Sequence, residues 1–294
     1  MLTVAQAFDK FRQKLELTDT EKNDAQRRHT EVRECIRAKF DVKRDFLTGS
    51  YKRHTKTKPL KDIDIFFVLG PKDFYRRKEA ASKMLDAFEN CLIEKYGSDK
   101  VERGRRCITV EFDKVYQTQE PDGKVLSIDA VPAFEMAEHF DIADDNLGKW
   151  IESDPEIHAQ LATDKNKALD GKWKPLVKML KRWNSEAKKP IKPSFLLEVM
   201  AQDLIDGPFS TYPDEIINFF SNAHETISNV WPDPANLGPP VSDQMDQARI
   251  NLAKETLRNA EKIADRAKRA ESLGNISEAL SLWRQLFGSY FPQS

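Results

Sequence analysis

The pattern of hydrophobic and polar residues changes near the middle of the chain, from strands mixed with helices to helices alone. Residues 62–69 are apolar after a second acid, which predicts a strand buried on both faces. Residues 107–112 alternate as a strand, and residues 125–131 predict a strand that returns across the turn signalled by Pro121-Asp122-Gly123. Apolar residues at helical spacing predict helices over residues 3–17, 18–40 and 72–96. The first half is therefore expected to be a sheet accompanied by helices.

Beyond Pro132 the pattern predicts helices, with no strand signal of comparable strength. The expected helices cover about residues 154–169, 172–187, 194–206, 213–229, 242–271 and 275–287. We therefore expect an α+β protein, with a mixed lobe over residues 1–150 and an all-helical lobe over residues 151–294. The site described next should lie in the cleft between the two lobes.

Two acids stand at the entrance of the strand that begins at residue 62. Side chains on a strand alternate between its faces, so Asp62 and Asp64 project from one side while Ile63 and Ile65 point to the other. Adjacent carboxylates repel each other, and a divalent cation that prefers oxygen ligands would relieve that repulsion. The Gly49-Ser50 turn upstream offers free backbone N–H groups and a hydroxyl. Together these features indicate a site for a metal-bound nucleoside triphosphate.

A third acid, Asp129, lies between Ile128 and Ala130 in the predicted returning strand. A buried aspartate without a partner is costly, and the cation already inferred for the other two acids would be such a partner. The alternative is that Asp62 and Asp64 form a solvated strand entrance and that Asp129 is a capped turn residue.

Composition restricts the class of protein. The chain has 294 residues, a net charge of -1 and 39% hydrophobic residues, which fits a soluble protein with a sizeable core. Its three cysteines lie far apart and form no C-x-x-C pair, so neither a zinc ribbon nor a disulfide framework is suggested. No apolar run is long enough to cross a membrane, and the first residues resemble the start of an amphipathic helix rather than a signal peptide. A cytoplasmic protein with no specific nucleic-acid partner is expected, despite a basic run over residues 165–192.

The motifs resemble those of a known superfamily. Gly49-Ser50, the acid pair that begins twelve positions after the serine and the third acid on a later strand are similar to the signature of polymerase-beta-like nucleotidyltransferases. The segment from Thr48 to Ile65, the Lys-Met-Leu-Lys-Arg-Trp-Asn helix at 178–184, Pro193-Ser194-Phe195 and the Asp233-Pro234 loop resemble a narrower group. That group is the bacterial cGAS/DncV-like nucleotidyltransferases (CD-NTases), which are relatives of the oligoadenylate synthases.

The resemblance implies roles for individual residues. Asp62, Asp64 and Asp129 would hold two Mg²⁺ ions, with Mn²⁺ as an alternative metal. The residues implied to bind the nucleotide are Gly49, Ser50, Thr55, Lys181 and Ser194. The chain departs from the family where His54 replaces the glycine that often precedes the threonine. Lys181 could instead be an exposed helix lysine, and Ser194 could cap the helix after Pro193.

The resemblance also implies an activity. We expect a synthase that joins NTPs, ATP among them, into a cyclic di- or trinucleotide second messenger. In such an enzyme a 3′-hydroxyl attacks an α-phosphate and pyrophosphate leaves. The expected setting is CBASS-type antiphage defence, in which an effector recognises the product and a regulatory protein is a further candidate partner. One alternative is a transferase acting on an RNA 3′ end or a small-molecule hydroxyl, and another is a catalytically silent nucleotide- or RNA-binding module. The sequence leaves the product's size, bases and linkage open.

Overall fold

The fold was determined as a computed structural model, which describes residues 2–112 and 126–293. The turn expected at Pro121-Asp122-Gly123 lies outside these residues. The chain divides into two compact units. The sheet unit is Leu17–Gln160 with Ala235–Gly238, and the helical unit is Met1–Glu16, Leu161–Pro234 and Pro239–Ser294.

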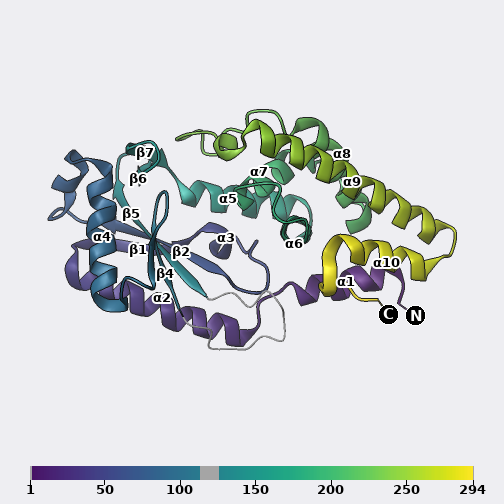
Figure 1. Ribbon diagram of the computed structural model, residues 1–294, viewed down its shortest axis with the longest axis horizontal. Helices are drawn as coiled ribbons and strands as arrows, with labels where there is room; N and C mark the ends of the chain where they lie inside the picture. The colour runs from purple at the N-terminus through teal and green to yellow at the C-terminus, as the bar shows by residue number, and fades with distance from the viewer. Residues whose placement is uncertain (1, 113–125, 294) are drawn as a thin grey trace. The chain divides into compact units, whose positions relative to one another are not determined.

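The sheet unit is built on one mixed sheet, which in the described residues has seven strands (Figure 1). These are β1 (Val42–Thr48), β2 (Asp62–Leu69), β3 (Val101–Arg103), β4 (Ile108–Glu111), β5 (Ser127–Glu135), β6 (Phe140–Asp144) and β7 (Lys149–Ser153). The order is β1-β2-β5-β4-β3, and β6 pairs with both β5 and β7. Strands β2 and β5 run parallel, so their N-terminal ends meet at the same edge of the sheet.

Helices cover one face of this sheet. They are α2 (Asp19–Lys39) and α4 (Ala81–Tyr96); the unit also contains the short helices α3 (Gly49–Lys52) and η1 (Phe74–Lys78). Ile63 and Ile65 of β2 are fully buried in a core that also holds Val32 of α2 and Phe88 of α4. The predicted alternation of β2 is therefore confirmed, because the residues between its acids point into this core.

The opposite face of β2 carries the two acids and then becomes apolar. Phe66 and Val68 pack there against Phe140 and Ile142 of β6 and Ile151 of β7. The hydrophobic packing of this face begins two residues beyond Asp64, so it fixes the strand while leaving the acids at the edge of the packed region.

The prediction of helices alone after Pro132 is wrong. Strand β5 continues to Glu135, and β6 and β7 follow it. Proline lacks the N–H that a strand interior needs, but here it lies where two ladders meet. The pairing of β4 with β5 ends at Ala130, and the pairing of β6 with β5 begins at Ala133. Pro132 therefore interrupts neither ladder. The single helix expected over residues 72–96 is likewise divided into η1 and α4.

The helical unit contains the remaining helices. They are α1 (Val4–Lys14), α5 (Pro155–Ala168, which begins in the sheet unit), α6 (Trp173–Glu186), α7 (Ser194–Leu204), α8 (Tyr212–Thr226), α9 (Gln247–Ser272), α10 (Ile276–Phe287) and the short η2 (Val241–Gln244) and η3 (Gly288–Tyr290). The α+β fold class is confirmed, with a sheet unit and an all-helical unit. In the described part of the chain, no helix combines the length and the apolar character needed to span a membrane.

Helix α1 belongs to the helical unit, which differs from the division expected at residue 150. The ring of Phe8 lies 5.1 Å from that of Trp283 and 5.1 Å from that of Phe291, and Phe11 lies 4.7 Å from Phe287. Aromatic rings at these separations pack edge to face or tilted, and they bury a large apolar area. The first helix thus completes the core formed by the last one. The functional roles expected for residues 1–150 and 151–294 remain predictions.

Candidate active site

The sheet brings the three predicted acids together on one face. Asp64 of β2 lies directly opposite Asp129 of the neighbouring parallel strand β5, and Asp62 lies opposite Ser127. Because paired strands are about 4.8 Å apart, Asp64 and Asp129 are nearest neighbours across the ladder. Asp62 is two residues earlier on the same face. The topology therefore produces a row of carboxylates at the shared N-terminal edge of two strands.

The three acids crowd one another electrostatically. The pKa of Asp129 is raised to about 7, first by burial and then by the negative charge of Asp64, with a smaller contribution from Asp62. One hydrogen bond opposes this shift, because the hydroxyl of Thr109 on β4 donates to Asp129 Oδ1 at 2.7 Å. Burial and the neighbouring carboxylates thus disfavour the charged form of Asp129.

Lys56 is a residue of this site that the sequence analysis missed. Its ammonium group lies 2.5 Å from Asp62 Oδ1, and only 12% of its side chain is exposed. Lys56 also lowers the pKa of Asp129. The loop before β2 contains several basic residues, and nothing in their spacing distinguishes Lys56 from the others. Only the folded loop shows which lysine faces an acid.

Gly49 allows the chain to pass directly against Asp64. Its φ is +61°, and a Cβ placed on it would lie 1.7 Å from Asp64 Oδ2. Any other residue would meet both a disfavoured backbone conformation and a collision with the carboxylate. The following residue, Ser50, accepts hydrogen bonds at its carbonyl from the N–H groups of Thr55 (3.0 Å) and Lys56 (3.1 Å). These two hydrogen bonds therefore fold the segment from Ser50 to Lys56 into a closed turn beside the acids.

His54 and Thr55 support this turn. His54 has a φ of +56°, so the histidine adopts the left-handed conformation that a glycine adopts easily. The presence of His54 where the family often has glycine thus changes the side chain but keeps a backbone conformation that glycine can adopt. Thr55 is fully buried, and its hydroxyl donates to the Ser50 carbonyl at 3.5 Å. This contact holds the turn; the expected contact of Thr55 with phosphates remains a prediction.

Lys181 is buried in the helical unit and paired with an acid. Its ammonium lies 2.6 Å from Glu198 Oε1, and the two side chains are 9% and 3% exposed. The alternative that Lys181 is an exposed helix lysine is therefore wrong. Glu198 was missed because an acid in the largely apolar sequence of α7 gives no sign of its partner on α6.

Ser194 is the first residue of α7 and lies one turn before Glu198. Residues four apart share a helix face, so Ser194 lies on the side of α7 that meets Lys181. The N-cap position is occupied by Pro193, and no side-chain cap is formed there. The helix-cap alternative for Ser194 is therefore not supported, while its contact with a nucleotide remains a prediction.

The acids suit a divalent cation in charge and donor type. Among residues 2–112 and 126–293, no three His, Cys, Asp or Glu side chains are already gathered as a metal cage. Instead, Asp62 faces the ammonium of Lys56 and Asp129 accepts from Thr109. Carboxylate oxygens are the ligands that Mg²⁺ and Mn²⁺ prefer. The crowded charge at Asp129 and the cation already beside Asp62 show that positive charge is favoured here, so the residues fit the metal.

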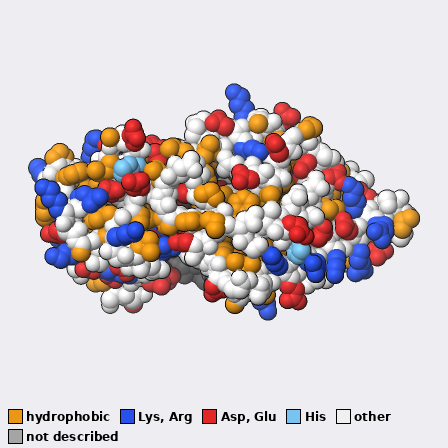
Figure 2. Space-filling view, turned by 90° about the horizontal axis from the view of Figure 1, so that it is seen from above, with side chains coloured by type: hydrophobic (Ala, Val, Ile, Leu, Met, Phe, Trp, Pro, Cys, Tyr) orange, Lys and Arg blue, Asp and Glu red, His pale blue; other side chains and the backbone are white. Residues whose placement is uncertain are grey.

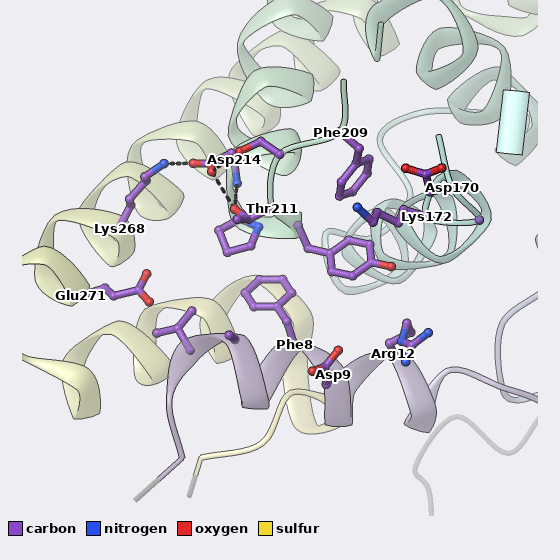
Figure 3. Close-up of a pocket in the computed structure, with 16 residues that line it drawn as sticks. Phe8, Asp9, Arg12, Asp170, Lys172, Phe209, Thr211, Asp214, Lys268 and Glu271 are labelled. Atoms are coloured by element: carbon purple, nitrogen blue, oxygen red, sulfur yellow. Dashed lines mark hydrogen bonds and ion pairs between the residues drawn. The ribbon is translucent and has the colours of Figure 1, made fainter. Parts of the chain in front are cut away.

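A separate cavity of about 600 Å³ lies within the helical unit (Figure 3). Phe8 and Arg12 of α1 line one side, and Phe209 and Lys172 line another. None of the predicted site residues borders it. Among its polar groups, Asp214 accepts from Thr211 and pairs with Lys268.

On the face drawn in Figure 2, Lys and Arg side chains are interspersed with Asp and Glu rather than gathered in one basic surface.

Comparison with known protein families gives a match over most of the sheet unit. The sequence profile of the Second Messenger Oligonucleotide or Dinucleotide Synthetase domain matches residues 1–166. A probable cyclic nucleotide synthase of Bacillus cereus (strain VD146) is 26% identical over 281 residues, which cover 83% of this chain and 81% of that protein. A cyclic AMP-AMP-AMP synthase of Acinetobacter sp. (strain ATCC 27244 / 9458) is 26% identical over an alignment covering 100% of this chain and 87% of that protein.

Solved structures share the whole fold. CdnC of E. coli MS115-1, solved with ATP, superimposes with a TM-score of 0.71 at 18% identity and covers 99% of both chains. The same protein in a complex with HORMA-deltaN gives a TM-score of 0.69, at 18% identity and 98% coverage of both chains. At this identity the likeness concerns the fold.

Proposed function

Because the chain belongs to the Second Messenger Oligonucleotide or Dinucleotide Synthetase family, and is thus a nucleotidyltransferase of the cyclic oligonucleotide synthase type, we propose that Asp62, Asp64 and Asp129 are its catalytic residues. The observation that carries the proposal is the pairing of Asp64 with Asp129 across β2 and β5, with Asp62 on the same face. Acids on two adjacent strands are the arrangement that two-metal nucleotidyl transfer requires.

The acids hold the metal, and the protein positions the reactants. Asp62, Asp64 and Asp129 would hold two Mg²⁺ ions, or Mn²⁺ in their place, with Asp62 and Asp64 as the ligands that both ions would share. Once bound, the ions supply charge neutralisation for the attacking 3′-hydroxyl and the leaving pyrophosphate. Gly49 and Ser50 present backbone N–H groups and a hydroxyl to the triphosphate, in a turn held by Thr55. The contact between Gly49 and Asp64 fixes the distance from that turn to the acids.

Lys181 and Ser194 contribute from the helical unit. Glu198 pairs with the Lys181 ammonium at 2.6 Å. A lysine in this state is ready to exchange its carboxylate partner for a phosphate oxygen. Ser194, on the same face of α7, adds a hydroxyl to the same phosphate group.

The product is a cyclic di- or trinucleotide made from NTPs, ATP among them, by successive attacks of a 3′-hydroxyl on an α-phosphate. We place the enzyme in the cytoplasm, in CBASS-type antiphage defence, where an effector recognises the product. A regulatory protein partner is consistent with CdnC, which has been solved with HORMA-deltaN.

Product analysis tests the proposal directly. The purified protein, incubated with the four NTPs and Mg²⁺, should form a phosphatase-resistant nucleotide whose size and bases mass spectrometry identifies. Asp62→Asn and Asp64→Asn should each abolish it while the fold persists. Asp19→Asn is the matched control, because the Asp19 side chain is 92% exposed on α2. An Asp64→Asn variant that still forms product would refute the assignment of the acids. Extension of a labelled RNA 3′ end, without a cyclic product, would instead favour the transferase alternative.

A further inference from the structure

Two cysteines that the sequence separates meet on the helix-covered face of the sheet. Cys35 on α2 and Cys91 on α4 are 56 positions apart, yet their sulfur atoms are 3.8 Å apart. Cys35 Sγ is 3.8 Å from the Cys91 carbonyl oxygen, and Cys91 Sγ is 3.7 Å from the Cys35 carbonyl oxygen. Both residues are free thiols. The backbones of the two helices are therefore close enough at this point for the side chains to meet.

Polar contacts hold the helices together around the two thiols. The ammonium of Lys39 on α2 pairs with Glu94 on α4 at 3.1 Å. The ammonium of Lys95 on α4 donates to the Glu31 carbonyl of α2 at 3.0 Å. These contacts keep the two sulfur atoms next to each other, and a disulfide of about 2.0 Å requires only a further approach of the side chains.

The surroundings make the two thiols unequal. The pKa of Cys35 is lowered to about 7, chiefly by its hydrogen bond with Cys91 and further by Lys95 and Lys39, although burial opposes this. The pKa of Cys91 is raised by the same hydrogen bond and by burial. Cys35 is also the more exposed of the two. The thiolate is the reactive form of cysteine, so Cys35 is the nucleophile and Cys91 the resolving thiol.

We propose that Cys35 and Cys91 form a reversible dithiol–disulfide centre that hydroperoxides oxidise. The Cys35 thiolate attacks a peroxide oxygen, the O–O bond breaks and a sulfenic acid forms on Cys35, while the hydroxide that leaves takes up the proton lost by the Cys35 thiol and becomes water. The Cys91 sulfur then attacks the Cys35 sulfur, the S–O bond breaks and water leaves with the thiol proton. Overall, two thiols and one hydrogen peroxide give one disulfide and two water molecules. A small thiol reverses the oxidation by exchange.

The disulfide would enclose the segment that carries half of the active site. The loop from Cys35 to Cys91 contains β1, the Gly49-Ser50 turn and both acids of β2. Closing a loop of this length restricts the unfolded chain, so oxidation stabilises the sheet unit. This inference does not depend on the proposed function, because it concerns the opposite face of the sheet.

The test uses the reduced full-length protein and hydrogen peroxide. Titrated in denaturant, the protein should show three thiols before oxidation and one afterwards, with all three recovered by dithiothreitol. Peptide mapping without reduction should find Cys35 linked to Cys91. The melting temperature should rise by about 5 °C or more on oxidation. Retention of all three thiols, or their loss without a linked peptide, would overturn the proposal.

Serine variants separate the two roles. Cys91→Ser should stop at a sulfenic acid on Cys35, which dimedone traps. Cys35→Ser should form neither the disulfide nor the dimedone adduct. Cys107→Ser is the matched control and should still lose two thiols, because burial raises the pKa of Cys107 and keeps that thiol unreactive. If Cys35→Ser and Cys91→Ser lose thiols as the unmodified protein does, the pairing is wrong. The linked peptide of the unmodified protein decides the question without any variant.

Discussion

Asp64 is the residue with the least freedom in the site. The backbone of Gly49 lies against its carboxylate, and Asp129 lies opposite it on the next strand. The position of Asp64 therefore depends on the turn as well as on the sheet. Since metal-dependent transfer requires ligands held within fractions of an ångström, this contact connects the shape of the turn to turnover.

Gly49→Ala should abolish most activity. The added methyl group must displace Asp64, and the positive φ costs about 1–2 kcal/mol. We expect turnover to fall by about 100-fold or more, in line with the cost of misplacing a reacting group. Gly148→Ala is the control: its φ is +63°, but no atom lies within 4 Å of the added Cβ. It should lose similar stability and keep its turnover, as measured by thermal melting and product formation. Equal loss of turnover in both variants would contradict this explanation.

Asp129→Asn should be inactive and yet more stable than the unmodified protein without metal. The substitution removes one of three crowded charges, so in EDTA the melting temperature should rise by about 3 °C or more. The folded-state pKa of Asp129 is raised to about 7, so the unmodified protein loses stability as the pH rises from about 4 to 7. The advantage of the variant should therefore grow over that window and then level off. Added Mg²⁺ should stabilise the unmodified protein more than the variant, which keeps Asp62 and Asp64 but lacks the third carboxylate.

Asp144→Asn should have the opposite effect on the melting temperature. Asp144 is fully buried, and Arg105 and Arg106 donate to it at 2.9 and 2.8 Å, which helps to lower its pKa. Its substitution should lower the melting temperature, because it removes the charge that balances two arginines. If Asp129→Asn is also destabilising in EDTA, the three acids do not repel one another as described.

At this scale, alternation along a strand predicted which residues share a face but not which residues face them. Asp62, Asp64 and Ile63 follow from period two alone. Lys56 and Glu198 do not, because their partners are fixed by how a loop folds back and by which helices pack together. Residues that neutralise charge are found only once the chain is folded.

At the scale of the element, helical spacing located the helices of the second half within a few residues, whereas the strands β3, β6 and β7 were missed. Strands β6 and β7 are only five residues each, and Pro132 resembles the end of the strand region. A five-residue strand offers too few alternations to stand out, and its stability comes from pairing, of β6 with β5 and of β7 with β6. Pairing partners distant in the chain are not encoded in a local pattern.

Variants of the Lys181–Glu198 pair between α6 and α7 test whether Lys181 binds the nucleotide or only stabilises the buried Glu198. Lys181→Met should destabilise the protein by about 3 kcal/mol, because Glu198 is left buried and charged. The double variant Lys181→Met/Glu198→Gln should regain most of that stability in urea unfolding. Its turnover should remain low if Lys181 contacts the triphosphate. Recovery of turnover with stability would show that Lys181 has only a structural role.

A second lysine of α6 supplies the control. Lys178 is 8% exposed and pairs with Glu16 at 2.7 Å. Lys178→Met should lose stability as well, while the KM for NTPs stays unchanged. Lys181→Met should raise that KM, so an equal rise for Lys178→Met would mean that both changes act through the packing of the helix.

At the scale of the molecule, the two units have separate cores, and the chain passes from one unit to the other more than once. The helical pattern of residues 3–17 predicted a helix correctly, but it could not show which core the helix enters. Phe8 and Phe11 are separated from Trp283 by almost the whole chain, and they pack together because the last helix exposes an aromatic face. Loss of that contact should therefore affect the far end of the sequence.

Phe8→Ala should loosen the helical unit at its C-terminal helix. Removing a fully buried ring costs about 3–5 kcal/mol, and the cavity would open beside Trp283 and Phe291. Hydrogen exchange measured by mass spectrometry should then rise over α10 and stay unchanged over α4, since local opening follows the contacts that are lost. Phe88→Ala, which removes a ring 4.8 Å from Phe40 in the sheet unit, should give the reverse pattern. If either variant raises exchange equally in α10 and α4, the two cores unfold as one cooperative structure. The packing of α1 in the helical unit would then affect the stability of both units.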